Sequence, residues 1–530
     1  GGPIRGQCDF DVKSHGDIVV SRDRVRHRMI TPPRPASPTG VTRLVAYPSQ
    51  PEPEEEPVGN DRTENPLEIA VRERLAARFE SNIEDLSALV RIPSVSWPAF
   101  DPAHVAQSAE AIAAMLREIG IFDVVDVRRA PIEGGTELGQ PAVVARREPR
   151  NGRPTVLLYA HHDVQPPGKD EDWETPPFEP TRRDGRLYGR GAADDKAGVM
   201  SHIGAIRALT EAIAGGEPGT EDLDLGIALF IEGEEEWASQ SFGNFLRENR
   251  ELLAADAIIV ADSSNWDVDT PALTVALRGA VAFNVTIETL DRASHSGMFG
   301  GAVPDAMLAA VRLLDTLWDA DGAVAVEGLQ SAELTVPAYD EARLREETGL
   351  LEGVSPIGRG EILSRLWAEP AISITGIDAP DVANASNTLI PRTRVRISAR
   401  IAPGQDPTAA YAAITRHLSD HAPFGAKLTF EDAGLGQAFQ VDTSGWAVAE
   451  VRGAMADAWE KAPVDIGVGG SIPFIAELVE EFPSAEILVT GVEDPDGRAH
   501  SPNESLHLET FRKSMLTEAL FLTRLNQRGA

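Results

Sequence analysis

Two segments of the chain combine imidazole and carboxylate side chains, which are ligands that divalent metal ions prefer in proteins. The first segment, AHHDVQPPG, presents His161 and Asp163 directly after an apolar run. The second, GRGAADDKAG, carries Asp194 behind a glycine-rich turn. Further along, the acidic segment EGEEE supplies Glu235 and Glu236 after another apolar run. These residue types in these places indicate metal-dependent chemistry.

Two later residues extend this set. Asp262 follows the apolar run 257–261, and His500 lies ten residues beyond the run that ends at residue 490. Together the candidates provide two imidazoles and five carboxylates, enough for two divalent cations that share one carboxylate. Two ions about 3.5–4 Å apart activate a water and polarise a carbonyl in many hydrolases. Of the pair Glu235 and Glu236, one could bind metal while the other moves protons.

Each of these elements alone has an ordinary explanation. A histidine and an aspartate after a strand usually form a satisfied polar pair, and an acidic run is usually a solvated turn. Asp262 alone could cap a helix, and His500 alone could be a surface loop residue. The metal interpretation is favoured because all the candidates leave the same side of one predicted sheet, where open α/β sheets bind their ligands.

The hydrophobic pattern predicts the elements that position these residues. Apolar runs alternate with amphipathic helical segments, which is typical of a mostly parallel sheet covered by helices on both faces. We therefore expect an α/β fold. Strands are expected at 122–127, 142–146, 155–160, 225–231, 257–261 and 486–490. Helices are expected at 66–90, 103–119, 199–213, 242–253, 447–459, 474–480 and 507–526.

The middle of the chain has a different pattern. Strands are expected at 280–289, 393–401 and 426–431, helices at 303–318 and 408–418, and an irregular acidic stretch at about 322–370. This pattern predicts an α+β unit with an antiparallel sheet, inserted into the α/β domain. The domain segments are expected to be 66–270, 271–436 and 437–530. Residues 1–65 mix prolines and charges without periodicity, which predicts a disordered segment.

The composition limits the possible partners. The 530 residues include 49 Lys and Arg against 83 Asp and Glu, a formal net charge of −34, which argues against nucleic acid and anionic membranes. The single cysteine, Cys8, cannot form an intrachain disulfide, which favours a reducing compartment. No stretch approaches the ~20 apolar residues of a membrane helix. We therefore expect a cytoplasmic protein that binds neither nucleic acid nor membranes.

Seven motifs occur in an order that resembles a known family: HHDVQPPG, WETPPF, LYGRGAADDKAG, EGEEEWAS, RASHSGMFGG, GGSIP and GRAHSPNE. The chain is similar to the dinuclear zinc peptidases that include carnosinases, bacterial dipeptidases, glutamate carboxypeptidase and aminoacylases. The resemblance covers about residues 66–526, and the DVQP and DWETPPF segments are most similar to the carnosinase-like dipeptidase branch. It implies that the α/β domain is catalytic and that the inserted α+β domain is a lid and dimerisation domain.

The resemblance also implies how the metal ligands are shared. His161 and Asp262 would bind one metal ion, and Glu236 and His500 would bind the other. Asp194 would bridge the two ions, with a cis peptide bond after it. The ions would be zinc, with manganese as the alternative.

Catalytic and substrate-binding roles follow from the same resemblance. Glu235 would be the general base and then the acid, and Asp163 would orient the His161 imidazole. His295 would stabilise the oxyanion in the active site of the partner subunit of a homodimer. Arg400 would hold a substrate carboxylate, which suits the two-pronged guanidinium. Without the resemblance, a turn histidine would be as good an explanation of His295 as a catalytic role. The ordinary explanation of Arg400 is an arginine on an edge strand.

The sequence departs from the family pattern at Ala197, Ala293, Gly467 and Val468, which leaves the substrate contacts open, but it keeps every metal position. His162 is expected to point away from the site. We therefore expect a zinc-dependent dipeptidase or short-peptide exopeptidase that uses metal-activated water. The alternatives are an amidohydrolase that removes an N-acyl group from an amino acid and, from a different class, a non-catalytic binding protein on the same fold.

Overall fold

The computed structural model describes residues 65–216, 222–469 and 473–528. The segment predicted to be disordered, residues 1–65, lies outside the described residues apart from Asn65, so that prediction is not tested. Among the described residues, no helix has the length and apolar character that crossing a membrane requires.

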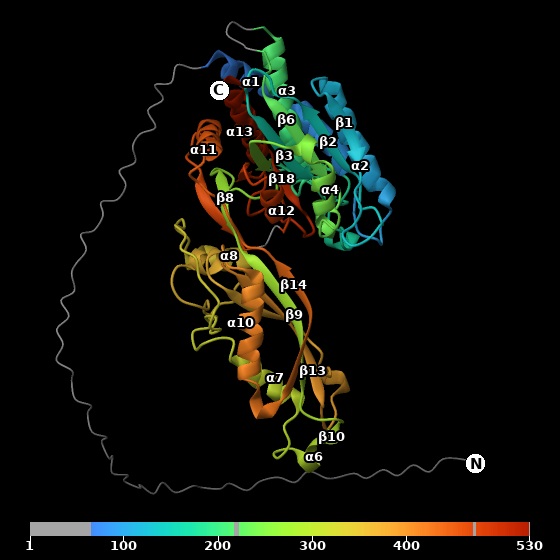
Figure 1. The fold of residues 1–530 in the computed structure, drawn as a ribbon, viewed down its shortest axis with the longest axis vertical. Coiled ribbons are helices and arrows are strands. Elements are labelled where there is room, and N and C mark those ends of the chain that lie inside the picture. The colour runs from blue at the N-terminus through green and yellow to red at the C-terminus, as the bar shows by residue number, and fades with distance from the viewer. Residues whose placement is uncertain (1–64, 217–221, 470–472, 529–530) are drawn as a thin grey trace, which may run out of the picture. The chain divides into compact units, whose positions relative to one another are not determined.

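A nine-stranded sheet organises the larger part of the described chain (Figure 1). Eight strands follow the order β1-β2-β6-β3-β7-β17-β8-β15, and β16 pairs with β8. The central strands β6, β3, β7 and β17 are parallel, whereas β2 and β8 run antiparallel to them. The strands are β1 (Val124–Arg128), β2 (Ala142–Arg147), β3 (Thr155–His161), β6 (Gly226–Glu232), β7 (Ala257–Val260), β8 (Ala272–Leu277), β15 (Phe439–Gln440), β16 (Val464–Val468) and β17 (Glu486–Val489).

The central strands are buried on both faces, which explains their continuous apolar sequences. Every residue of β3 and β6 is buried. Parallel strands end at the same edge of a sheet, so residues that end or follow β3, β6, β7 and β17 come together there. His161 is the last residue of β3, and Asp262 follows β7 closely, so the fold delivers both to this edge.

Helices cover both faces of the nine-stranded sheet. The first face packs into one large apolar core with α1 (Pro66–Val90), α2 (Pro102–Ile119), α3 (Lys196–Ala214), α11 (Trp446–Trp459) and α13 (Leu508–Gln527). The second face packs against α4 (Phe242–Glu248), α5 (Arg250–Leu253) and α12 (Pro473–Glu481). Aromatic rings fill this second core: the ring of Tyr159 lies 4.4 Å from that of Phe474, and Phe230 stacks on Phe245 at 4.7 Å.

Aspartate caps fix the starts of two of these helices. Asp101 caps α2, and Asp195 caps α3 by accepting a hydrogen bond from the Gly198 backbone amide at 3.1 Å. Such caps satisfy amide groups that the first helical turn leaves without partners. The cap on α3 also holds the turn immediately before that helix, which carries Asp194.

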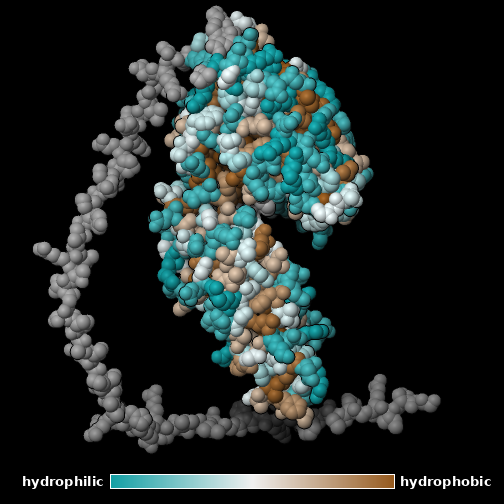
Figure 2. Space-filling view, viewed as in Figure 1, coloured by the Kyte–Doolittle hydropathy of each residue, from teal (hydrophilic) through white to brown (hydrophobic). Residues whose placement is uncertain are grey.

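A four-stranded antiparallel sheet with the order β11-β13-β9-β14 forms a separate core. Its strands are β9 (Gly279–Glu288), β11 (Ala371–Ile377), β13 (Arg392–Ile401) and β14 (Lys427–Gly436). Buried and half-buried residues alternate along β9, and the buried side packs against α7 (Ala306–Asp315) and α10 (Pro407–Asp420). Figure 2 shows apolar patches among polar residues over this part of the surface.

Shorter elements complete the fold. One small sheet pairs β10 (Ser294–His295) with β12 (Thr388–Leu389), and another joins β18 (Ser505–His507), β5 (Arg186–Tyr188) and β4 (Thr181–Arg183). The short helices are α6 (Ser296–Phe299), α8 (Glu341–Thr348) and α9 (Ile362–Trp367), with 3-10 turns η1 (Asp170–Asp172), η2 (Glu235–Trp237), η3 (Val382–Asn384) and η4 (Pro423–Gly425). The acidic stretch predicted to be irregular thus contains α8 and α9.

The predicted α/β fold with a mostly parallel sheet is confirmed. The single helix predicted over 242–253 is wrong, because Asn249 separates α4 from α5. The Asn249 side chain bonds to the Phe245 carbonyl at 2.9 Å and to Arg128 at 2.7 Å, which competes with helical geometry. The division into domains at 66–270, 271–436 and 437–530 stays a prediction, although the strands of the four-stranded sheet all lie between residues 279 and 436.

Candidate metal centre

The first group of candidate ligands surrounds the imidazole of His161 at the end of β3. This side chain is completely buried. Its Nε2 lies 3.0 Å from Asp194 Oδ1 and 3.9 Å from Asp262 Oδ1. The ligand atoms of His161, Asp194 and Asp262 all lie within 4.8 Å of one another, which is close enough for one ion to touch all three.

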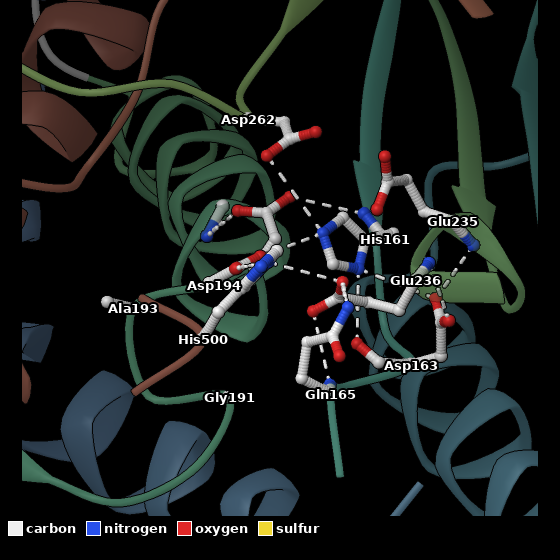
Figure 3. Close-up of polar contacts among 12 residues, drawn as sticks. His161, Asp163, Gln165, Gly191, Ala193, Asp194, Glu235, Glu236, Asp262 and His500 are labelled. Atoms are coloured by element: carbon white, nitrogen blue, oxygen red, sulfur yellow. Dashed lines mark hydrogen bonds and ion pairs between the residues drawn. The ribbon is translucent and has the colours of Figure 1, made fainter. Parts of the chain in front are cut away.

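The second group lies on the other side of Asp194, as Figure 3 shows. His500 Nε2 lies 3.0 Å from Asp194 Oδ2 and 3.3 Å from Glu236 Oε2. These three ligand atoms also lie within 4.8 Å of one another. Asp194 therefore presents one carboxylate oxygen to each histidine, and the two groups share it.

The donor set fits two divalent cations. Imidazole nitrogens and carboxylate oxygens suit zinc, and they also suit manganese when carboxylates predominate. Among the described residues, no Lys or Arg forms an ion pair with Asp194, Glu236 or Asp262, so only the two histidines offset their charge. Grouped carboxylates without basic partners are stabilised by bound cations.

Asp163 connects the two parts of the site. Its Oδ1 lies 3.4 Å from His161 Nδ1, and its backbone carbonyl lies 3.1 Å from the same nitrogen. Its two carboxylate oxygens also accept the backbone amides of Glu235 and Glu236, at 3.1 and 3.0 Å. Asp163 therefore orients the His161 ring and holds the η2 turn beside it.

The turn η2 carries two glutamates with different surroundings. Glu236 is buried and accepts hydrogen bonds from the backbone amide and side chain of Gln165, at 3.1 and 2.6 Å. The Glu235 side chain is half-buried, and its carboxylate has no hydrogen-bond partner among the described residues. The sequence did not single out Gln165; its only signal is its place in the same loop as Asp163.

The turn before α3 is held from several sides. The peptide bond between Asp194 and Asp195 is cis, as the resemblance implied. Asp195 Oδ2 accepts the backbone amide of His161 at 3.1 Å while the other oxygen caps α3. The buried ammonium of Lys196 donates to the carbonyls of Leu89 and Ile92, at 2.9 and 2.7 Å. These contacts fix the direction of the Asp194 side chain.

Glu504 is a further buried residue at this turn that the sequence did not reveal. Its carboxylate accepts the backbone amides of Gly191, Ala193 and Asp194, at 3.1, 3.0 and 3.2 Å. It also pairs with the guanidinium of Arg190. Both residues belong to motifs noted in the sequence, GRGAADDKAG and GRAHSPNE, but no spacing rule indicates that they meet.

The electrostatics of the site show how strongly it attracts positive charge. Hydrogen bonds with Asp194 and Glu236 raise the pKa of His500 to about 11. Burial raises the pKa of Asp262 to about 6 and that of Glu236 to about 7, where repulsion by Asp194 adds to the effect. Burial, with repulsion by Asp262 and Glu236, also raises the pKa of Glu235 well above its usual range, although His161 opposes the shift. A cation between these groups would replace the protons.

Three predicted residues lie apart from the ligand groups. His162 is buried with Nε2 3.0 Å from the Pro141 carbonyl, away from the ligands, and burial lowers its pKa to about 4. His295 is exposed in β10, and its Nδ1 accepts the Gly297 amide at 3.1 Å. Arg400 lies in β13 of the four-stranded sheet. The structure therefore brings neither His295 nor Arg400 into the two ligand groups of its own chain.

One departure from the family pattern has a structural partner. Gly467 lies in β16, and a Cβ atom built on it would lie 2.6 Å from the Cβ of Trp367 in α9. The acidic stretch that contains α9 thus occupies the space that a side chain at residue 467 would need. This contact explains why glycine is present at that position.

Paired ligand groups at the carboxyl edge of a mostly parallel sheet fit the class of two-metal hydrolases. The chain belongs to peptidase family M20/M25/M40, whose model matches residues 157–524. This match confirms the family predicted from the motifs, and the chain is therefore a metallopeptidase.

Three known proteins illustrate the similarity. The chain is 33% identical over 454 residues to the cysteinylglycine-S-conjugate dipeptidase of Corynebacterium striatum, covering 84% of this chain and 96% of that protein. It is 29% identical over 435 residues to the Beta-Ala-His dipeptidase of Rattus norvegicus, covering 77% and 85%. The crystal structure of human carnosine dipeptidase 1 matches with a TM-score of 0.68 and 26% identity, covering 87% and 99%. These matches confirm the similarity to the carnosinase-like dipeptidase branch.

Proposed function

We propose that the chain hydrolyses the peptide bond of dipeptides or short peptides with the help of two divalent metal ions. The observation that carries the proposal is the shared carboxylate, because Asp194 faces His161 with one oxygen and His500 with the other. The dipeptidase activities named for the relatives in Corynebacterium striatum and Rattus norvegicus support this substrate class.

In this proposal, His161 and Asp262 would hold one ion, Glu236 and His500 would hold the other, and Asp194 would be shared by both, as the two ligand groups allow. Zinc suits the mixture of nitrogen and oxygen ligands, and manganese is the alternative. When bound, the ions supply Lewis-acid chemistry, since they lower the pKa of a water and polarise the scissile carbonyl.

Glu235 moves the proton in the proposed reaction. It takes a proton from the water as the water oxygen bonds to the carbonyl carbon. It then delivers that proton to the amine nitrogen as the carbon–nitrogen bond breaks. The raised pKa and the free carboxylate of Glu235 suit a group that must both accept and return a proton. Asp163 keeps this group in place through the Glu235 backbone amide.

We also propose a homodimer in which His295 serves the site of the partner subunit by stabilising the oxyanion. β9 has ten residues and so spans about 33 Å, and His295 lies beyond the end of β9 that is farther from β8. This placement favours a role outside the ligand groups of its own chain. The adjacent helix α6 exposes Met298 and Phe299, which are 73% and 47% accessible and are typical of a contact surface.

The proposed function is tested with the purified full chain, reconstituted with zinc or with manganese, against a dipeptide panel and N-acetyl amino acids. We expect two equivalents of bound metal, cleavage of dipeptides, and loss of activity in EDTA that added metal restores. Faster cleavage of N-acetyl amino acids would identify an amidohydrolase instead, and a metal-free, inert protein would identify a binding protein. Sedimentation velocity tests the homodimer. The cytoplasmic location and the absence of nucleic-acid and membrane partners stay predictions.

A further inference from the structure

Trp97 and Trp237 form an aromatic pair beside the turn that carries the proposed base. Their ring centroids lie 4.4 Å apart at an interplanar angle of 53°. Both side chains are half-buried, and neither packs against any of the three apolar cores of the described residues. Tryptophan is stabilised mainly by burial of its large ring, so a pair outside the cores with part of its surface exposed is typical of a contact site.

The backbone around the two rings places them at the edge of the nine-stranded sheet that carries the ligand groups. Trp237 ends the turn η2, two residues after Glu235. The segment that leads to Trp97 runs beside the loop after β3, since Val95 forms a parallel bridge with Val164 and donates no ladder beyond it. The pair therefore borders both the loop that follows the first histidine and the turn of the proposed base.

Hydrogen bonding does not explain the position of the Trp97 ring. Its Nε1 is buried and has no hydrogen-bond partner among the described residues, although a buried indole N–H usually finds one. The ring is instead held by its contact with Trp237. Phe100, three residues further on, is 38% exposed and also lies outside the three cores. Residues 97–100 thus add apolar rather than polar surface to this side of the site.

The order of the strands indicates which part of a peptide reaches the aromatic pair. The segment before Trp97 contacts the loop before β2, because the Gln140 side chain donates to the Ser96 carbonyl at 3.4 Å, and η2 follows β6. On the other side of β3, the sheet continues through β7 and β17 to β8, which leads into β9. Arg400, which the resemblance assigns to the substrate carboxylate, pairs with Ala280 at the start of β9. A peptide whose C-terminus points towards Arg400 therefore directs its N-terminal residue towards the aromatic pair.

We propose that Trp97 and Trp237 form the contact surface for the side chain of the substrate's N-terminal residue, so that the enzyme prefers dipeptides with a large apolar or aromatic residue at that position. This inference rests on the proposed function and deepens it, because it names the class of side chain that the site accepts. The exposed parts of the two rings are buried when such a side chain binds, which favours it over a small or charged one.

The test compares phenylalanylglycine with alanylglycine as substrates of the metal-loaded enzyme. We expect a higher kcat/KM for phenylalanylglycine, and we expect W97A to reduce the ratio of the two values about 10- to 100-fold. The loss should lie mainly in KM, since the contact is present before and during the reaction. W97F keeps a ring and should retain most of the preference. Metal content and circular dichroism confirm that the variants fold and bind two ions.

The reversed peptides, glycylphenylalanine and glycylalanine, test the position of the side chain. Their ratio of kcat/KM should be the same in W97A and in the unmodified enzyme. A change in this ratio, with none for the first pair of peptides, would place the aromatic pair beside the C-terminal residue and overturn the proposal. Equal cleavage of phenylalanylglycine and alanylglycine by the unmodified enzyme, or an equal loss for both in W97A, would overturn it as well.

W446A provides a matched control. Trp446 is also a half-buried tryptophan, and its ring lies 4.4 Å from the Arg528 guanidinium. Its backbone amide donates to Glu486 at the first residue of β17, so it lies at the opposite edge of the sheet from the ligand groups. W446A should keep the preference for phenylalanylglycine. Loss of the preference in W446A as well as in W97A would show a general effect of removing a tryptophan.

A binding measurement separates this inference from the proposed function. The metal-loaded E235Q protein is titrated with phenylalanylglycine and with alanylglycine, and each titration is repeated after W97A is added to E235Q. Tighter binding of phenylalanylglycine that disappears with W97A supports the aromatic contact even if the unmodified enzyme cleaves neither peptide. Equal binding of the two peptides, or binding of neither, contradicts the aromatic contact even if the enzyme proves to be a dipeptidase.

Discussion

Arg190 Nη1 donates a hydrogen bond to Glu504 Oε2 across 2.6 Å, and both side chains are almost completely buried. The Glu504 carboxylate also accepts the backbone amide of Asp194 at 3.2 Å. Arg190 Nη2 donates a hydrogen bond of 3.4 Å to the carbonyl of Ser501, which is the residue directly after His500. One ion pair therefore ties together the two loops that carry the shared carboxylate and the second histidine.

Substitution of Glu504 by glutamine is expected to weaken metal binding. The glutamine keeps the size of the side chain but loses the charge that pairs with Arg190 and accepts several amides. Loss of such a supporting partner typically lowers metal affinity by about 10- to 100-fold. The pair Arg190–Glu504 supports the loops that carry Asp194 and His500. We therefore expect the variant to lose one of the two ions at a lower chelator concentration than the other. Stepwise chelator competition with zinc measures the two affinities.

E68Q is the control for that experiment. Glu68 also forms a partly buried pair with an arginine, Arg524, at 3.1 Å, but it lies in α1 and takes no part in the ligand groups. Both variants are expected to lower the melting temperature. If E68Q weakens metal binding as much as E504Q, the loss reflects general destabilisation and the positioning role of Glu504 is wrong.

Substitution of Glu235 by glutamine is expected to abolish turnover without loss of metal. The amide cannot accept the proton, and loss of a positioned general base typically costs about 10²- to 10⁴-fold in rate. Two equivalents of zinc should remain, since Glu235 belongs to neither ligand group. Metal analysis and steady-state kinetics are measured on the same sample, with E171Q as an exposed control. Substantial residual turnover would sink the assignment of Glu235 as the base.

Substitution of Asp163 by asparagine is expected to impair both metal binding and catalysis. Asp163 holds His161 Nδ1 and accepts two backbone amides from η2, whereas an asparagine side chain has only one oxygen to accept them. We expect kcat and zinc affinity each to fall about 10- to 100-fold. Kinetics at saturating zinc separate the two effects. Unchanged kcat at saturating zinc would show that Asp163 serves metal affinity alone.

Glu232 is expected to give the fold a distinctive pH dependence. Tyr159 Oη donates to Glu232 Oε2 at 2.6 Å, and Glu232 Oε1 has no partner among the described residues. Burial raises the pKa of Glu232 from 4.5 to about 8, against the opposing hydrogen bond from Tyr159. The folded chain therefore keeps a proton that the unfolded chain releases. The proton on Glu232 therefore stabilises the folded chain. This stabilisation is complete below about pH 4.5 and is lost as the pH rises to about 8.

The variant E232Q measures this effect, because glutamine stays neutral at every pH. The free energy of unfolding of E232Q should exceed that of the unmodified chain by an amount that grows between pH 5 and pH 8, with a slope of at most about 1.4 kcal/mol per pH unit. Urea unfolding at four pH values in this range provides the comparison. A difference that does not vary with pH would show that Glu232 is ionised in the folded chain.

The central part of the fold was predictable because its strands are buried on both faces. The run 155–160 is apolar except for Thr155 and the hydroxyl of Tyr159 and corresponds to β3, and the apolar run 257–261, flanked by Asp256 and Asp262, corresponds to β7. Strands β8 and β16 escaped prediction: β8 is separated from β9 by Arg278 alone, and the five residues of β16 include Asp465 and Gly467, which are uncommon in strands. Their pairing with each other depends on contacts that are distant in the sequence.

The ligand groups were predictable for a related reason. His161 and Asp262 come directly after apolar runs, so their position at the edge of the sheet follows from the parallel arrangement. His500 was included because it follows the apolar run that ends at residue 490, but its loop contains several turns after β17, so its pairing with Glu236 came only from the motif resemblance. Glu504 and Arg190 could not be predicted as partners, because their contact requires the loop after His500 to fold back under the turn of Asp194.

The position of β17 in the sheet has a consequence for synthesis of the chain. β17 lies between β7 and β8, although both of these strands leave the ribosome long before it. Until β17 emerges, a nascent chain presents an unpaired edge of β7, which is a site for unwanted pairing with other chains. His500 follows β17 in the chain, so the second ligand group cannot form before β17 is available to fill its place in the sheet.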